Sequence, residues 1–310
     1  MNNGAPGTLV SLLDGVIDYA GLFPPAEHDM DEMVRRFAAG LAGHASWMLG
    51  RVVVPITRLD EFEQAAAGLL PASDTEDPWC LSLLVSSAED VALAADIDRL
   101  AAFNSCHCVP ENGLALADVI ELRAQTSDGI DQALDLLPDD VFPFFELAAD
   151  EDNRGLIAAL AGSEAAAKIR TGGVKPELNP STRSVARFIH QCVQAGVPFK
   201  ATAGLHHPLP NEEPTIPAHQ QGFLNVFAAA VVVDSHKIDE DQVVELLDLI
   251  EGFSFEDDHM KVGDYKLSRE QIEEARAGLA ISFGCCSWED PLADLQALGL
   301  LPRTDSVGSS

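Results

Sequence analysis

The sequence predicts a single (β/α)8 TIM barrel, an α/β fold in which eight parallel strands alternate with helices. Eight short apolar runs are separated by segments whose apolar residues recur at helical spacing. Continuous apolar runs in such an alternation are typical of a parallel sheet that is covered on both faces. The chain has 310 residues and is 47% hydrophobic, which suffices for eight such units around one core. A doubly wound open sheet is the alternative, because periodicity alone does not exclude it.

The strands and helices are expected in strict alternation. The expected strands are residues 16–23, 51–56, 80–86, 117–124, 141–148, 165–173, 197–205 and 279–287. Helical patterns occupy residues 31–43, 88–103, 153–162 and 181–196. In the last of these, Ser181 is expected to cap the amino end and Gly196 to end the helix.

The segment between the seventh and eighth strands is longer than a plain barrel unit needs. Residues 206–278 hold a Pro-rich stretch, two helical patterns and an acidic stretch. We expect the Pro-rich part to lie over the barrel mouth and residues 253–258 to add a pair of strands. Since no linker divides the chain, residues 1–303 are expected to form one barrel with an enlarged insertion. The polar end, 304–310, is expected to be a disordered tail.

The charge is strongly negative. The chain has 19 Lys and Arg against 50 Asp and Glu, a formal net charge of -31, and the acid is spread along the sequence. This indicates a solvated acidic surface. A more specific prediction is that the protein comes from a halophile with an acidic proteome, because salt screens the repulsion among its acidic groups. Binding to a nucleic-acid backbone or to an anionic membrane is not expected, because both need clustered basic residues.

Neither a secretion signal nor a membrane span is expected. No apolar run reaches the length of a spanning helix, and no basic segment precedes an apolar one at the start. The six cysteines match no disulfide framework. The sequence therefore predicts a cytoplasmic protein with reduced thiols.

Two lysines stand out in this base-poor chain. Lys168 and Arg170 alternate along the sixth strand, and Lys200 and Thr202 along the seventh, so each pair shares one face. If that face looks into the barrel, two ammonium groups meet near the carboxyl ends of the strands, where barrel active sites lie. Desolvation and mutual repulsion would lower their pKa values, and a neutral lysine can attack a carbonyl to form a Schiff base.

A structural explanation competes with this one. Each lysine would pair with Glu121 or Glu146 as an ion pair in the core, because an unpaired buried ammonium is costly. A shift of one residue would turn Lys168 and Arg170 to the outer face and remove the argument.

Five motifs occur in the same order as in one enzyme family. They are "IDYAGLFP" (17–24), "LADVIEL" (116–122), "KIRTG" (168–172), "FKATAG" (199–204) and "FGCCS" (283–287). The set resembles the class I aldolases of the deoxyribose-phosphate aldolase family. Their Schiff-base strand reads Lys-Thr-Ser-Thr-Gly, and a second lysine follows at a similar interval. The resemblance covers about two thirds of the chain and is weak outside these motifs.

The resemblance implies catalytic roles. Lys168 would be the Schiff-base nucleophile and Lys200 the neighbouring cation that lowers its pKa. Asp118 would relay protons with a water, and Asp18 would hold that network. Glu146, on the fifth strand, is a further carboxylate candidate, with a structural ion pair as its equal alternative.

Several positions depart from the family pattern, so deoxyribose 5-phosphate is not the expected substrate. Arg170 replaces a small residue, and its guanidinium would bind a carboxylate or phosphate or else pair with Glu121 or Glu146. The family's phosphate-binding turn is replaced by "AGLHHP" (203–208). The residues expected to contact substrate are Arg170, Thr171, Thr202, Gly204, Gly284, Cys286 and Ser287.

The function expected is therefore a Schiff-base aldolase or lyase acting on a small carbonyl compound, with no metal or organic cofactor. A homodimer is compatible with it, since barrels of this kind are often dimers. One alternative is a metal-assisted lyase or hydrolase that uses His206, His207 and Cys286. The other is a catalytically inert barrel that binds an anion through its cationic residues.

A structural zinc site is not indicated by the sequence. Such sites usually show paired ligands two to four residues apart at two places. Only Cys106, His107 and Cys108 come close, and they have no clear partner elsewhere in the chain.

Overall fold

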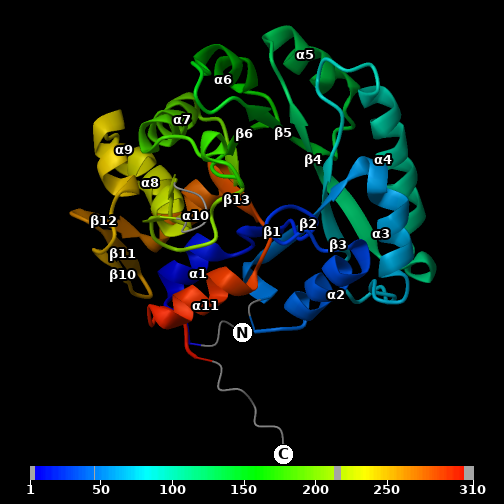
Figure 1. Ribbon diagram of the computed structural model, residues 1–310, viewed down its shortest axis with the longest axis horizontal. Coiled ribbons are helices and arrows are strands. Elements are labelled where there is room, and N and C mark those ends of the chain that lie inside the picture. Colours follow the sequence, from blue (N-terminus) through cyan, green and yellow to red (C-terminus); the bar gives the residue numbers. More distant parts are fainter. Residues whose placement is uncertain (1–3, 45, 213–217, 304–310) are drawn as a thin grey trace, which may run out of the picture.

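Eight parallel strands close into a barrel within the residues that the computed structural model describes, 4–44, 46–212 and 218–303 (Figure 1). Their order around the barrel is β1–β13–β7–β6–β5–β4–β3–β2. The barrel strands are β1 (Ile17–Tyr19), β2 (Leu49–Pro55), β3 (Trp79–Leu84), β4 (Ala115–Arg123), β5 (Phe142–Leu147), β6 (Ala166–Arg170), β7 (Phe199–Thr202) and β13 (Ala280–Cys285).

The predicted fold class is confirmed. Every expected strand overlaps one strand of the barrel, and closure between β1 and β13 excludes the open sheet. The expected disordered tail, 304–310, lies outside the described residues.

Helices surround the barrel, as Figure 1 shows. They are α1 (Gly7–Leu13), α2 (Met30–Leu41), α3 (Leu59–Ala66), α4 (Leu93–His107), α5 (Ser127–Leu136), α6 (Arg154–Leu160), α7 (Thr182–Ala195), α8 (Phe223–His236), α9 (Glu240–Leu247), α10 (Arg269–Gly278) and α11 (Glu289–Ala297). Short 3-10 turns are η1 (Ser46–Met48), η2 (Ile56–Arg58), η3 (Pro110–Asn112) and η4 (Pro176–Leu178).

The predicted ends of α7 are confirmed. The Ser181 side chain accepts a hydrogen bond from the Ser184 amide, which satisfies one of the free amides of the first turn. Gly196 ends the helix in the left-handed region, at φ 64°, where a side chain would be strained.

The segment between β7 and β13 is enlarged, as expected, but its sheet differs from the prediction. A short ribbon, β8 (Asn211–Glu212) and β9 (His219–Gln220), precedes α8 and α9. The expected pair of strands is a three-stranded antiparallel sheet of β10 (Phe253–Phe255), β11 (His259–Val262) and β12 (Tyr265–Ser268). The third strand was missed because residues 265–268 alternate charged and apolar residues too briefly to stand out.

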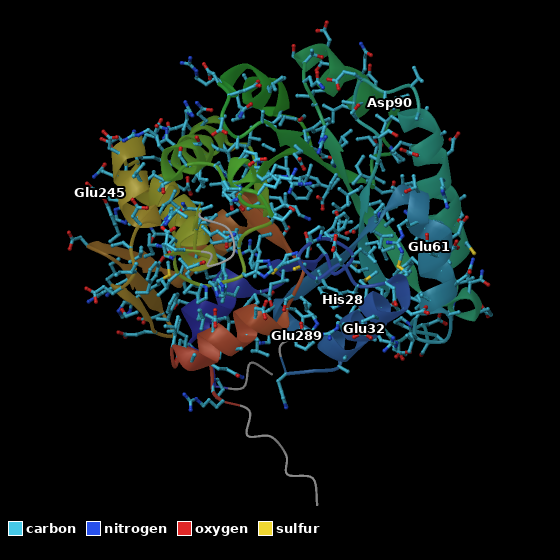
Figure 2. All side chains as sticks on the ribbon, in the orientation of Figure 1. His28, Glu32, Glu61, Asp90, Glu245 and Glu289 are labelled. Carbon is cyan, nitrogen blue, oxygen red and sulfur yellow. The ribbon has the colours of Figure 1, made fainter. Side chains whose placement is uncertain are left out.

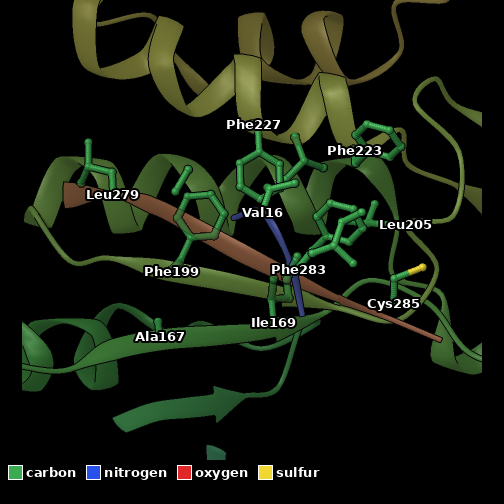
Figure 3. Close-up of a cluster of buried hydrophobic side chains, with 14 of the residues drawn as sticks. Val16, Ala167, Ile169, Phe199, Leu205, Phe223, Phe227, Leu279, Phe283 and Cys285 are labelled. Atoms are coloured by element: carbon green, nitrogen blue, oxygen red, sulfur yellow. The ribbon is translucent and has the colours of Figure 1, made fainter. Parts of the chain in front are cut away.

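Helix α8 is buried against the barrel rather than half exposed. Phe223 and Phe227 project from it onto Phe283 of β13, with ring centroids 5.3 and 5.9 Å from that ring (Figure 3). Phe199 of β7 and Leu205 lie in the same cluster (Figure 3). A helix that is apolar on all sides is stable only when buried, so α8 joins the insertion to the main core.

The barrel interior is divided into an apolar floor and a charged upper layer. Val119, Phe144 and Ala166 are buried together, and Phe142 and Ile281 pack against them. On β4, β5 and β6, the residues two positions after these three carry charged side chains on the same inward face. The floor therefore shields the charged layer from the amino-terminal end of the barrel.

Acidic side chains stand outward on the helices and loops that cover the barrel. Figure 2 shows Glu61, Asp90 and Glu245 on this outer layer, far from one another. None of the helices in the described ranges is long and apolar enough to cross a membrane.

Candidate active site

A cavity of about 550 Å³ opens at the carboxyl ends of the barrel strands. One side of it is apolar and includes Phe23, Val53 and Leu84, while the other carries charged side chains from β4, β5 and β6. Carboxyl ends of strands are where (β/α)8 barrels hold their reacting groups. The cavity is therefore the candidate active site.

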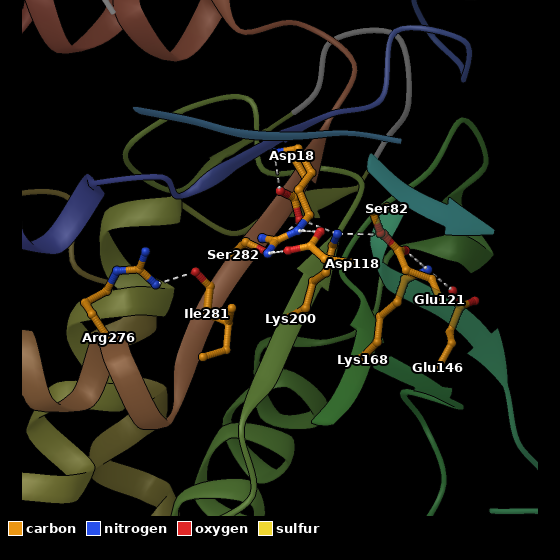
Figure 4. A network of polar contacts seen from close by, with 11 residues as sticks. Asp18, Ser82, Asp118, Glu121, Glu146, Lys168, Lys200, Arg276, Ile281 and Ser282 are labelled. Carbon is orange, nitrogen blue, oxygen red and sulfur yellow. Dashed lines mark hydrogen bonds and ion pairs between the residues drawn. The ribbon is translucent and has the colours of Figure 1, made fainter. Parts of the chain in front are cut away.

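Lys168 lies at the inner end of this cavity and faces into the barrel, as predicted. Its Nζ is 2.6 Å from Glu121 Oε2 and 2.6 Å from Glu146 Oε2, and its side chain is 3% exposed (Figure 4). The register places Lys168 directly opposite Glu146 on β5. Glu121 and Glu146 therefore both contact the amine of Lys168, which borders the cavity.

Lys200 lies deeper than Lys168 and is fully buried. Its Nζ is 2.6 Å from Glu121 Oε1 and also donates to Asp18 Oδ2. It does not border the cavity, whereas Lys168 does. The two lysines occupy matching positions on β6 and β7 and share the carboxylate of Glu121 (Figure 4).

The two buried carboxylates are fixed by further donors. Ser82 Oγ donates to Glu121 Oε1 at 2.7 Å, and Ser282 Oγ donates to Asp18 Oδ2 at 2.7 Å. The backbone amide of Arg51 donates to Asp18 Oδ1 at 3.0 Å. These hydrogen bonds, together with the lysine contacts, leave both carboxylates little freedom to turn.

The electrostatics of Lys200 contradict the expected mutual repulsion. Burial alone would lower the pKa of Lys200, but Asp18 and Glu121 outweigh burial, and its pKa is raised. Burial alone would raise the pKa of Glu121 and of Glu146. The attraction of Lys168, joined by Lys200 at Glu121 and by Arg170 and Arg123 at Glu146, outweighs burial, so both pKa values are lowered. The expected cation–cation contact is in fact a cation–anion–cation bridge.

Asp118 is not brought to the lysines, contrary to prediction. It accepts two hydrogen bonds from Arg51, at 2.8 and 2.6 Å, and does not border the cavity. The pairing of β3 with β4 shifts between Ala117 and Val119, so Asp118 is the extra residue of an irregularity. The inward alternation continues from Val119 to Glu121. Glu121 therefore occupies the place that the resemblance assigned to Asp118.

Arg170 does not pair with Glu121 or Glu146. Within the described ranges no carboxylate lies in salt-bridge distance of its guanidinium, and its one hydrogen bond is a long one, 3.5 Å, to the carbonyl of Gly172. It borders the cavity together with Arg123, whose Nε is 3.6 Å from Glu146 Oε1. Arg170 is thus a cation at the mouth with donors to spare.

Three of the other predicted contact residues border the cavity. Thr202, Gly284 and Cys286 lie along its edge on the β7 and β13 side. A Cβ at Gly284 would come within 2.8 Å of Thr202 Oγ1, so this position favours glycine. The three residues form the wall facing the apolar side.

The remaining three predicted contact residues, Thr171, Gly204 and Ser287, do not border this cavity and contact the backbone instead. Thr171 is buried and its hydroxyl donates to the carbonyl of Ala203 at 2.6 Å. Gly204 lies at φ 77°, where a Cβ would come within 2.8 Å of Gly172 Cα. Ser287 Oγ accepts from the amide of Asp290 at 3.1 Å at the start of α11. Gly204 and Ser287 border an adjoining hollow instead.

The residues of the metal alternative are only partly together. His206 Nε2 is 3.7 Å from Cys286 Sγ and its Nδ1 is 3.7 Å from Cys285 Sγ. His207 turns away to Asp294, at 2.5 Å. Among the residues described, no group of three ligating side chains includes His206, His207 or Cys286.

The imidazole of His206 lies in an anionic setting. Burial alone would lower its pKa, but hydrogen bonds with Asp290, Cys285 and Cys286 outweigh burial, and its pKa is raised. His206 therefore contacts one carboxylate and two thiols, while His207 lies apart from them.

Sequence reasoning undervalued Glu121 and missed Ser82, Ser282 and Arg51. Glu121 was considered only as a pairing partner, because the motif on β4 drew attention to Asp118. A glutamate within the apolar run 117–124 was the available signal. The two serines gave none, since buried serines on apolar strands are common.

The comparisons with known proteins add no family. No family model matches the chain. No curated protein matches it either.

Proposed function

We propose that this barrel is a Schiff-base lyase or aldolase that acts on a small carbonyl compound through Lys168. The observation that carries the proposal is the contact of Lys168 Nζ with two carboxylates at the inner end of a cavity. An amine that must gain and lose protons while it forms and releases an imine needs such partners beside it. The order of the sequence motifs along the barrel strands also supports it, except that Asp118 of the second motif lies away from the lysines.

The first steps form the imine. Glu146, ionised because its pKa is lowered, accepts a proton from the Lys168 ammonium. The neutral amine attacks the carbonyl carbon, a C–N bond forms as the C–O π bond breaks, and one proton passes from the nitrogen to the oxygen to give a carbinolamine. Loss of that hydroxyl as water, with a proton returned by Glu146, leaves the iminium. Glu146 is suited to this role because its side chain, at 14% exposure, reaches the cavity edge.

The iminium then serves as an electron sink. A carboxylate removes the proton of the substrate's β-hydroxyl, the adjacent C–C bond breaks, and its electron pair moves into the C–N system as an enamine. An aldehyde leaves. Protonation of the enamine carbon and addition of water release the second carbonyl product and restore Lys168. Run in reverse, the same steps form the C–C bond.

Glu121 and Lys200 position and balance charge in this scheme. Glu121 is 2% exposed and is held by Lys168, Lys200 and Ser82. Because it has no free direction in which to move, it holds the Lys168 amine in place while Glu146 exchanges protons. Lys200 keeps Glu121 ionised, as its attraction contributes to the lowered pKa of that carboxyl.

The cavity favours a carbonyl compound with an anionic group and a small apolar portion. Arg170 has donors free at the mouth, and a guanidinium can grip a carboxylate or phosphate at two points. Phe23, Pro24 and Val53 line the opposite side and offer apolar contact. The proposal includes a homodimer, since barrels of this kind are often dimers. It also includes a cytoplasmic location.

Borohydride trapping tests the proposal. The protein is incubated with pyruvate, acetaldehyde, glyceraldehyde or their phosphates, reduced, digested, and analysed by mass spectrometry. We expect one reduced adduct on the peptide that carries Lys168. Lys168→Arg should abolish it, whereas Lys175→Arg, an exposed lysine just beyond the same strand, should leave it intact.

The outcomes separate the alternatives. An adduct that persists in Lys168→Arg would refute the assignment. Ligand binding without any adduct, detected by calorimetry with the same compounds, would favour an inert anion-binding barrel built on Arg170. Activity that disappears with a chelator and returns with metal would favour the metal-assisted alternative.

A further inference from the structure

Three ligating side chains converge on the outer helices, away from the cavity. Glu63 belongs to α3, while Cys106 and His107 end α4. One ligand atom from each lies within 4.8 Å of the other two. Glu63 is therefore the additional ligand that residues 106–108 lacked in the sequence. The fold brings it beside them from a distant part of the chain, so the spacing of residues in the sequence did not reveal it.

The imidazole of His107 is held in one orientation. Its Nδ1 is 2.8 Å from the carbonyl oxygen of Gly113, and a carbonyl only accepts, so Nδ1 carries a proton. The ring is nearly buried and packs on Phe103, with centroids 4.5 Å apart. A backbone carbonyl on one ring nitrogen is the usual means by which a metal-binding histidine is oriented.

The other nitrogen of this ring faces an acceptor. His107 Nε2 lies 3.1 Å from Glu63 Oε1. A ring nitrogen and a carboxylate oxygen at this separation can share a proton or can both bind one metal ion.

Cys106 decides between these in favour of a metal. Its sulfur is the third member of the group and is within reach of an amide donor, Asn112 Nδ2, at 3.7 Å. The same amide donates to the Cys106 carbonyl at 2.8 Å, which fixes the turn that ends α4. An imidazolium–glutamate pair has no use for a thiol, whereas nitrogen, sulfur and oxygen ligands together suit Zn²⁺.

We propose that Glu63 Oε1, Cys106 Sγ and His107 Nε2 bind one Zn²⁺, with water as the fourth ligand. Binding releases the thiol proton of Cys106 to solvent and leaves the metal as the cation between imidazole and carboxylate. The site joins α3 to the end of α4 and, through Gly113, to the loop that enters the amino end of β4. That end of a barrel serves stability, so the ion is structural.

Cobalt substitution reads out the sulfur directly. The protein is stripped with a chelator in concentrated KCl, which suppresses loose binding to the acidic surface. It is then titrated with Co²⁺ and followed by absorption. We expect a thiolate-to-cobalt charge-transfer band that saturates at one ion per chain and is displaced by Zn²⁺.

The neighbouring cysteine is a matched control. Cys108 is exposed like Cys106 but donates to the Ser105 carbonyl, at 3.2 Å, and is no member of the group. Cys108→Ser should keep the band, and Cys106→Ser should lose it. Glu63→Gln should weaken binding at least about 10-fold, the loss seen even when only a supporting partner of a metal ligand is changed.

Stability gives a second readout. Zn²⁺ should raise the unfolding temperature of the wild type and of Cys108→Ser, but not of Cys106→Ser, and Mg²⁺ should raise none of them. Absence of the band in the wild type, or its persistence in Cys106→Ser, would overturn the proposal. So would nitrogen NMR showing His107 doubly protonated with equimolar Zn²⁺ present.

Discussion

Glu146 lies directly opposite Lys168 on the neighbouring strand, and 2.6 Å separates Oε2 of the glutamate from Nζ of the lysine. Both glutamates border the cavity, but Glu121 also accepts hydrogen bonds from Lys200 and Ser82 and is 2% exposed, whereas Glu146 is 14% exposed. Glu146 is therefore the carboxylate better placed to exchange protons with a substrate.

Replacing Glu146 should slow the chemistry more than it unfolds the protein. Glu146→Gln keeps the shape but removes the proton acceptor, and loss of a general base typically lowers a rate about 10²–10⁴-fold. The rate of borohydride-trapped adduct formation measures this. Glu177→Gln, at an exposed position after β6, the strand that carries Lys168, should leave the rate unchanged. A rate in Glu146→Gln equal to the wild type would assign proton transfer elsewhere.

Replacing Glu121 should instead destabilise the fold. Glu121→Gln leaves two buried ammonium groups short of a counter-charge, and breaking a buried ion pair costs about 3–5 kcal/mol. Urea unfolding at constant salt measures the change in the free energy of unfolding.

The control for this loss is a glutamate in an exposed ion pair. Glu61 pairs with Arg58 at 2.6 Å on the surface, where such pairs contribute about 0–1 kcal/mol. Glu61→Gln should therefore change the free energy of unfolding by less than Glu121→Gln. Equal effects of the two variants would mean that the buried cluster adds no stability.

The pH dependence of stability follows from the lowered pKa of Glu146. Its folded pKa lies below the unfolded value of about 4.3, so the folded state binds its proton less readily. The stabilisation is complete above the unfolded pKa and is lost as pH falls through the folded one. The stability difference between wild type and Glu146→Gln should thus be constant near neutral pH and shrink in acid. A difference that grows in acid would reverse the assigned sign.

Salt should stabilise this protein strongly. With a formal net charge of -31, the folded chain repels itself in dilute buffer, and the screening length falls from about 10 Å at 0.1 M salt to about 3 Å at 1 M. The unfolding temperature should rise steeply from dilute to molar KCl. An unfolding temperature that does not change with KCl concentration would indicate that repulsion among the acidic groups does not affect stability.

The alternation of eight apolar runs with helices predicted the barrel, and the pairing of β1 with β13 then excluded the open sheet that the same alternation allowed. The sequence also placed Lys168, Lys200, Asp18 and Glu146 in one cluster, since alternation along parallel strands carries over between neighbours. It misplaced Asp118 because an irregularity in β4 shifts the alternation by one residue, and no local residue marks it. The ion pairs that the structural alternative predicted are present, between Lys168 and both glutamates and between Lys200 and Glu121. That one carboxylate bridges both lysines depends on register, which spacing does not reveal.

Arg170 should select anionic substrates. Its guanidinium has no carboxylate partner within the described residues, so a substrate anion gains a charged contact without displacing another. Such hydrogen bonds contribute about 1.5–3 kcal/mol, or roughly 10–150-fold in binding. Arg170→Met should raise the concentration of pyruvate needed for half-maximal trapping by that factor, and leave acetaldehyde unaffected. Arg154→Met, whose guanidinium already pairs with Asp152 on the surface, should change neither. Equal losses for both compounds in Arg170→Met would mean that Arg170 shapes the site rather than binding charge, because only the charged compound offers it a partner.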